Sequence, residues 1–152
     1  MKENCNEFTG LEKILDEWFD RAVPFPDPDP NKLQGHCVQL IRWLLANFWS
    51  LPQWVGQPSA ADFWSSYEWD KNISDHWEKI QYHEGFIPIE GDIFFQDKSK
   101  GGGHGHTGAV MGFDNTPFRF TALEQNYKPF VVTRVERNYN AVLGFFRRRN
   151  QG

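Results

Sequence analysis

Two histidines stand directly before an apolar stretch in the run KGGGHGHTGAVMGF, residues 100–113. The Thr, Ala and Val residues after His106 favour an extended strand, and the glycines before it favour a loop. An imidazole in such a position can ligate a metal, act as a catalytic base or belong to a loop. Which chemistry applies to His104 and His106 depends on the groups that the fold brings near them.

The turn in FDNTPF predicts which residues lie opposite the strand that follows His106. With the turn centred near residue 115, antiparallel partners have numbers that sum to about 231, so residues 124–126 lie across from His106. Side chains alternate between the two faces of a strand, so Glu124 and Asn126 share a face that His106 can also occupy. A carboxylate or amide acceptor there would fix the tautomer and ring orientation that a general base requires.

A candidate nucleophile lies far upstream in the chain. Apolar residues recur at steps of three and one in CVQLIRWLLANFW, which predicts a helix over residues 37–49 that packs against a core. Cys37 falls in the first turn of this helix, and a helix N-terminus and a nearby imidazolium both stabilise the nucleophilic thiolate. Together with His106 and its predicted carboxylate or amide partner, Cys37 matches the needs of a thiol acyl-transfer enzyme.

Each of these residues also has a simpler interpretation. A cysteine on an apolar helical face is often a small core residue, a histidine beside glycines is often a loop residue, and Glu124 alone would be a surface carboxylate. A zinc site at HGH would need about two more ligands, and the spacing of the other histidines, which are His36, His76 and His83, indicates none. We therefore expect no metal and no cofactor, and the conjunction of groups favours the thiol enzyme, with His104 as a loop residue.

The elements that must position these groups follow from the same patterns. Helices are predicted over residues 9–23, 37–49 and 59–69, with a Thr9–Glu12 capping box on the first, a cap near Ser59 on the third and a further helical turn within 72–80. Strands are predicted over residues 92–97, 106–113, 118–123, 130–136 and 141–147. Helices first and strands second predict an α+β fold with an antiparallel sheet, and the 152 residues predict a single domain, 1–152.

Composition excludes several classes of function. The net charge is −4, which argues against a nucleic-acid-binding protein, and the basic run at residues 147–149 is interpreted as a solvated tail. No apolar run approaches the roughly 20 residues of a membrane span, and the N-terminus lacks the apolar core of a secretory signal. Two cysteines are too few for a disulfide scaffold, and Cys5, in a polar leader, is interpreted as incidental.

Five segments resemble, in order, the blocks of the CHAP domain, a family of cysteine- and histidine-dependent amidohydrolases and peptidases with a papain-like fold. These segments are GHCVQLIRWLL, IPIEGDIFF, GHTGAVMGF, LEQNY and VLGFFR, and the resemblance covers residues 34–147. It implies N-terminal helices packed on an antiparallel sheet, with the nucleophile at a helix N-terminus. Carried over by position, it implies Cys37 as nucleophile, His106 as general base, Glu124 as orienting residue, Asn126 as a further polar site residue and Gln34 as a candidate oxyanion donor beside the Cys37 N–H.

The sequence departs from part of the family in the segment around the cysteine. Some phage members carry a calcium loop before the cysteine and an aspartate two positions after it, where this chain has Gln39. Asp27 and Asp29 alternate with prolines, and two carboxylates without further oxygen ligands make a poor calcium site. We therefore expect no calcium, and we interpret Asp92 in GDI as a structural residue.

The resemblance implies a peptidoglycan hydrolase that cuts an amide bond, as an N-acetylmuramoyl-L-alanine amidase or an endopeptidase. The expected setting is that of a phage lysin made in the cytoplasm without a signal peptide, released through a holin or carried on the virion, and acting as a monomer on the cell wall. No wall-binding module is visible, so a separate one could serve it. The alternatives are a cytosolic CHAP amidase acting on a small thiol–polyamine amide, and a non-catalytic papain-like binding domain.

Overall fold

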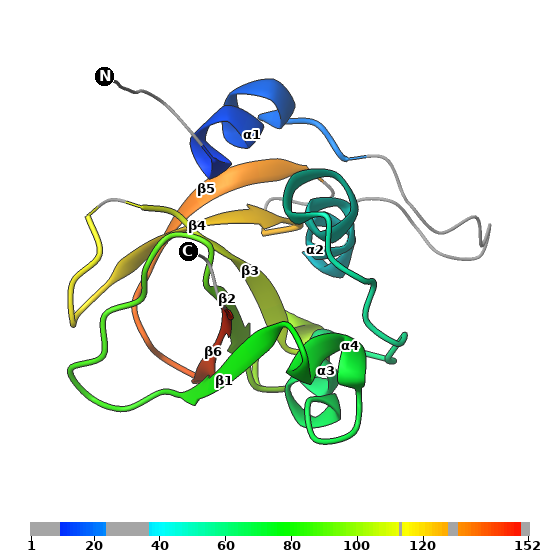
Figure 1. Ribbon diagram of the computed structural model, residues 1–152. Coiled ribbons are helices and arrows are strands. Elements are labelled where there is room, and N and C mark those ends of the chain that lie inside the picture. Colours follow the sequence, from blue (N-terminus) through cyan, green and yellow to red (C-terminus); the bar gives the residue numbers. More distant parts are fainter. Residues whose placement is uncertain (1–9, 24–36, 113, 128–130, 150–152) are drawn as a thin grey trace.

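The computed structural model describes residues 10–23, 37–112, 114–127 and 131–149. The helices are α1 (Leu11–Trp18), α2 (Cys37–Leu44) with a π-helical continuation (Leu45–Trp49), α3 (Ala60–Ser66) and α4 (Lys71–Ser74). The strands are β1 (Trp77–Gln81), β2 (Ile93–Gln96), β3 (His106–Val110), β4 (Phe120–Gln125), β5 (Val132–Arg137) and β6 (Val142–Arg148). Figure 1 shows these elements in sequence colours.

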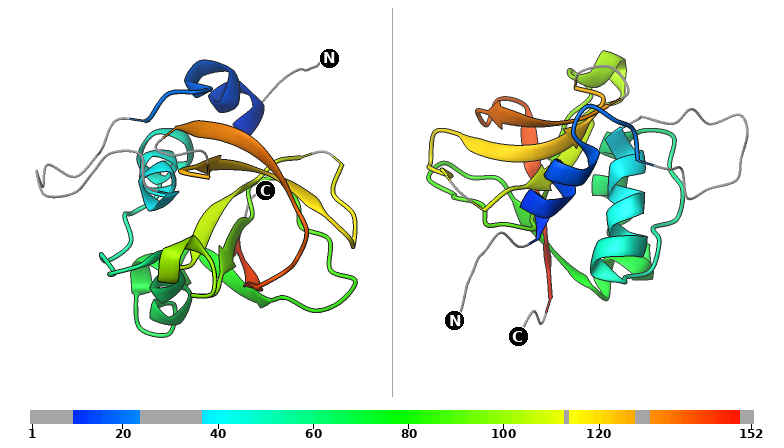
Figure 2. Two further views of the ribbon diagram at one scale, coloured as in Figure 1. Left: turned by 180° about the vertical axis from the view of Figure 1, so that it is seen from behind. Right: turned by 90° about the horizontal axis from the view of Figure 1, so that it is seen from above.

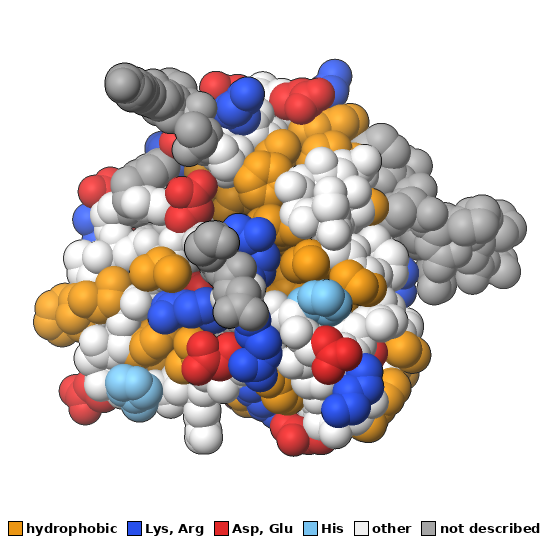
Figure 3. All heavy atoms as spheres, in the orientation of Figure 1, with side chains coloured by type: hydrophobic (Ala, Val, Ile, Leu, Met, Phe, Trp, Pro, Cys, Tyr) orange, Lys and Arg blue, Asp and Glu red, His pale blue; other side chains and the backbone are white. Residues whose placement is uncertain are grey.

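The six strands form one curved antiparallel sheet in the order β1-β6-β2-β3-β4-β5. Helices α1 and α2 lie beside the β3–β4–β5 part of the sheet, and α3 and α4 lie nearer β1 and β2 (Figures 1 and 2). The predicted α+β class with an antiparallel sheet is confirmed. Lys, Arg, Asp and Glu side chains are interspersed on the face drawn in Figure 3.

Both faces of the sheet are buried. Consecutive phenylalanines point to opposite sides, so Phe95 and Phe146 join the large core under the helices, whereas Phe94 and Phe145 join a smaller aromatic cluster on the other face with Phe120. Burying one such ring stabilises the fold by about 1.5–3 kcal/mol. The two-sided core holds the central strands rigidly, which matters because β3 and β4 carry the candidate site.

The helices differ from their predicted bounds in detail. Helix α1 ends at Trp18, well short of residue 23, and Asp20 adopts a left-handed φ of 64° that a helix cannot accommodate. The predicted capping box includes Thr9, which lies outside the described residues. Ser59 is the N-cap of α3 as predicted, but its Oγ donates to the Asp62 carboxylate rather than accepting from the backbone.

Residues 72–80 are predicted to form a further helical turn, and this prediction is wrong for the second half of the segment, which forms a strand. Helix α4 ends at Ser74, and Trp77–Gln81 is strand β1, paired antiparallel with β6. The Trp77 side chain is fully buried, whereas the charged residues that follow are partly or fully exposed. Pairing along the edge of the sheet, together with this one large anchor, outweighs the local helical pattern.

The interpretation of residues 147–149 as a solvated tail is also wrong. Arg147 lies in β6 and donates two hydrogen bonds to the buried Asp92 carboxylate, from Nε at 2.9 Å and from Nη2 at 2.8 Å. Asp92 also accepts from the Ile89 N–H at 2.9 Å, so it ties a loop to the last strand. This supports the interpretation of Asp92 as structural. Within the described ranges, no helix is long and apolar enough to cross a membrane.

Candidate active site

His106 is held at the first position of β3 by the turn before it. The glycine-rich segment forms a short 3₁₀ turn at Gly101–Gly103, and Gly105 has φ +75°. A Cβ at Gly105 would come within 2.5 Å of the Gln96 carbonyl oxygen, so both the backbone angle and the close approach require glycine there. The glycine run therefore fixes the point at which the strand starts and the imidazole emerges.

The pairing of β3 with β4 brings Glu124 to His106. Ala109 pairs with Leu123, which is one residue from the predicted register and within the allowed error. Gly108 lies beside Glu124, and a Cβ on Gly108 would come within 2.7 Å of the Glu124 Cγ. The missing side chain leaves the space through which Glu124 reaches the imidazole.

Three predicted residues meet in one hydrogen-bonded chain. The His106 Nε2 lies 2.6 Å from the Glu124 Oε1, and the Glu124 side chain is fully buried. The imidazole also shares a side-chain hydrogen bond with the Cys37 thiol. Because Nε2 is bound to the carboxylate, Nδ1 is the ring nitrogen that remains for the sulfur. Glu124 thus orients the ring, and it keeps the proton on Nε2 when the imidazole is neutral.

Arg137 is a site residue that the sequence argument missed. From β5 it donates through Nε to the Glu124 Oε2, and through Nη2 to Oε1 at 2.7 Å. Its guanidinium also lies over the Phe94 and Tyr127 rings, 5.4 and 5.3 Å from their centroids. The predicted strand stopped at residue 136, one position short, and local sequence carries no signal for a contact between side chains on different strands.

The neighbours of His106 favour its charged form. Burial acts to lower the pKa of the imidazole, but the hydrogen bonds with Cys37 and Glu124, together with their charges, raise it overall from 6.5 to about 9. His106 is therefore an imidazolium at neutral pH, with an N–H directed at the sulfur. An imidazolium there stabilises a thiolate and can later protonate a leaving group.

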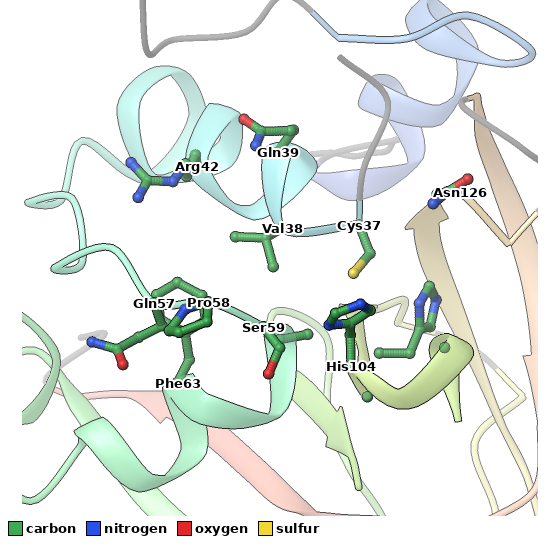
Figure 4. Close-up of a pocket in the computed structure, with 14 residues that line it drawn as sticks. Cys37, Val38, Gln39, Arg42, Gln57, Pro58, Ser59, Phe63, His104 and Asn126 are labelled. Atoms are coloured by element: carbon green, nitrogen blue, oxygen red, sulfur yellow. The ribbon is translucent and has the colours of Figure 1, made fainter. Parts of the chain in front are cut away.

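The thiol opens into a groove of about 690 Å³ between α2 and the segment that leads into α3. Figure 4 shows Cys37, Val38 and Arg42 along α2 on one side, with Gln57, Pro58 and Phe63 opposite. The middle of the groove is apolar and its two ends are polar.

The remaining predicted site residues have different positions. Asn126 lines the same groove with φ 72°, and its backbone N–H donates to the Val131 carbonyl at 3.2 Å. His104 is exposed at the groove, and its backbone carbonyl accepts from the Ala61 N–H. Gln34 lies outside the described residues, and so do Asp27 and Asp29. Among the residues that the structure places, no three His, Cys, Asp or Glu side chains are grouped to hold a metal ion.

No protein-family model and no curated protein sequence matches the chain. Solved structures match its fold. A wild-type endolysin, LysIME-EF1, gives a TM-score of 0.59 at 17% sequence identity, covering 89% of this chain and 61% of that one. Ly7917 solved with the hydrolyzing product of MDP gives a TM-score of 0.56 at 19% identity, covering 75% of this chain and 54% of that one.

A second structure of Ly7917 gives a TM-score of 0.52 at 19% identity, covering 75% of this chain and 53% of that chain. The chain thus spans about half to three fifths of the length of these proteins. At these identities the similarity establishes a fold shared with the structure of an endolysin.

Proposed function

We propose that this chain is a thiol-dependent peptidoglycan hydrolase of the CHAP type that cuts an amide bond. The observation that carries the proposal is the hydrogen-bonded chain Cys37–His106–Glu124 at a peptide-sized groove. The fold shared with an endolysin supports a cell-wall substrate. So does the fold shared with Ly7917, a structure that holds a hydrolysis product of MDP.

The first half of the reaction uses the thiolate–imidazolium pair. The Cys37 Sγ attacks the carbonyl carbon of the scissile amide, a C–S bond forms and the carbonyl oxygen takes the negative charge. The backbone N–H of Cys37 is one proposed donor to that oxygen, and Gln34 is retained as the second candidate. When the C–N bond breaks, the His106 imidazolium gives its proton to the leaving amine.

The second half returns the enzyme to its starting state. The now neutral His106 takes a proton from a water molecule, which attacks the thioester carbonyl. The C–S bond breaks, a carboxylic acid leaves and loses its proton to solvent, and the thiolate–imidazolium pair is restored. Glu124 orients the ring, a role that does not require it to accept the proton. Asn126 is proposed as a polar contact for the substrate at the groove wall.

The biological setting is proposed on the same basis. The chain would act as a monomer on the cell wall, released through a holin or carried on a virion, with a wall-binding module supplied separately. No calcium, other metal or cofactor has a role in this chemistry. Whether the bond lies between the sugar lactyl group and the stem peptide, or within the peptide, is decided by the products.

The test of substrate class compares two assays with the same enzyme. Purified peptidoglycan is digested and the soluble products are identified by mass spectrometry, alongside hydrolysis of a small thiol–polyamine amide. Release of stem peptides, or of fragments with new amino termini, is the expected result and names the bond. Hydrolysis of the small amide alone would contradict the proposal, and no hydrolysis of either substrate would favour a binding domain.

A further inference from the structure

We infer that the end of the groove formed by Arg42 and Gln57 is a carboxylate-binding subsite. The inferred substrate is a peptide that carries a free carboxylate within about two residues of the scissile amide. This inference rests on the proposed function, because it names the class of peptide that the same groove accepts. It assigns a role to a cation that the hydrolytic chemistry itself does not use.

The guanidinium of Arg42 has no polar partner among the residues that the structure describes. Its backbone carbonyl accepts from the Gln53 Nε2, but its side chain has no hydrogen bond, ion pair or ring contact with any of them. Arg137 and Arg147, by contrast, each donate to a buried carboxylate. The chain has 20 acidic residues against 16 basic ones, so a half-buried arginine without an acidic partner is unexpected.

The position of Arg42 relative to the thiol sets the distance to the reacting bond. Arg42 follows Val38 by four residues and therefore lies on the same face of α2, one turn further along. Arg42 lies five positions after Cys37, which corresponds to about 7.5 Å along the helix axis. An extended peptide covers about 3.3–3.6 Å per residue. A carboxylate bound at Arg42 therefore belongs to a residue about two positions from the amide.

The opposite wall of the groove provides the complementary contacts. Gln57 lies across from Arg42 at the same end of the groove (Figure 4), and its amide is a further hydrogen-bond donor at that end. Val38, Pro58 and Phe63 line the stretch between this end and the thiol and would contact methylene groups. A guanidinium beyond an apolar stretch fits an acidic side chain of the substrate. It donates two parallel hydrogen bonds to a carboxylate, whereas a substrate carboxamide has only one oxygen to accept them.

The test uses one preparation of purified peptidoglycan whose second stem residue carries a free carboxylate, divided into two halves. Carbodiimide and ammonia convert the carboxylates of one half to carboxamides, and the release of soluble fragments is measured at low substrate concentration. Amidation should slow the wild type by about 10- to 100-fold, the range for a hydrogen bond to a charged group. The Arg42→Gln variant should be slowed by a similar factor on the untreated wall and should not respond to amidation.

Two further variants control the comparison. Arg42→Lys keeps the charge without the planar fork and should retain part of the preference for the untreated wall. Arg119→Gln removes an arginine immediately before β4, away from Glu124 and in an exposed pair with Glu136, and should behave as the wild type. An Arg42→Gln variant as sensitive to amidation as the wild type would overturn the subsite alone. A wild type that releases nothing from either half would overturn the proposed function as well.

Discussion

His106 lies between a thiol and a buried carboxylate, and its two ring nitrogens have different partners. Nε2 is bound to Glu124, which leaves Nδ1 for Cys37. A catalytic histidine needs this asymmetry, because the nitrogen that exchanges protons with the substrate must not be the one that is permanently bound. His104 is two residues away, exposed, and without such partners among the described side chains.

The two histidines should therefore respond differently to removal. His106→Ala removes the proton donor and acceptor of both half-reactions and should lower peptidoglycan hydrolysis by about 10³-fold or more. His104→Ala removes only an exposed groove residue and should lower it by less than about tenfold. The measurement is the initial rate of fragment release by each folded variant. Equal losses from the two substitutions would contradict the assignment of His106 as the base.

The charged state of His106 gives a second prediction at this scale. Its ring should titrate with a pKa of about 9 by nuclear magnetic resonance, because the hydrogen bonds and charges of Cys37 and Glu124 outweigh the effect of burial. Activity should decline as the pH rises through this value, since the leaving amine then lacks its proton donor. Cys37→Ala should lower the pKa and Cys5→Ala should leave it near 9. A wild-type pKa at or below 6.5 would refute this electrostatic account.

At the scale of elements, three neighbouring strands build the site. His106 begins β3, Glu124 lies on β4, and Arg137 ends β5 and binds both oxygens of the carboxylate. A fully buried carboxylate is costly unless it is paired, and Arg137 supplies the compensating charge and holds the two Glu124 oxygens in place. The β3–β4 register places Glu124 beside His106, and Arg137 on β5 holds the Glu124 carboxylate in position.

A matched pair of substitutions separates this role from stability. Arg137→Met leaves Glu124 without its cation and should destabilise the fold by about 3 kcal/mol, and it should also lower the activity of the folded protein by about 10²-fold. Arg147→Met breaks a similar pair with Asp92 on a different strand, β6, and should destabilise without that loss of activity. Urea unfolding and the rate per folded molecule measure the two effects. Equal activity of both variants would show that Arg137 only stabilises the fold.

The patterns in the sequence predicted most of the elements but not all contacts between them. Short β-rich runs separated by turn residues located β2 to β6, and a turn in FDNTPF was enough to bring Glu124 to His106 within one residue. Strand β1 was missed because WEKIQ carries three polar residues and gains its pairing only from β6. The contacts made by Arg137 and Arg147 join residues on different strands, and no local pattern encodes them.

At the scale of the whole molecule, the protonation of His106 is coupled to the stability of the fold. The His106 proton is held more tightly in the folded chain than in the unfolded one, because its pKa is raised from 6.5 to about 9. The resulting stabilisation is fully present below pH 6.5, where both states are protonated. It is lost as the pH rises from 6.5 through 9, since the folded state binds more protons there and stability then falls with pH.

The size of this effect can be measured directly. The wild type should lose up to about 3 kcal/mol of unfolding free energy across the window, an order-of-magnitude value from the shift in pKa. His106→Gln should lack this loss, and the difference between the two proteins cancels the titration of all other groups. Urea unfolding at intervals between pH 6 and pH 9.5 provides the data. Parallel curves for the two proteins would contradict the coupling.

The claim that joins all three scales is that wall hydrolysis depends on the Cys37 thiol. The most direct measurement is the clearing of purified peptidoglycan by the wild type, Cys37→Ala and Cys5→Ala at equal concentrations, with thermal unfolding to confirm that each is folded. Clearing by the wild type and Cys5→Ala, with none by Cys37→Ala, is the predicted result. Clearing by folded Cys37→Ala at the wild-type rate would contradict the proposed chemistry.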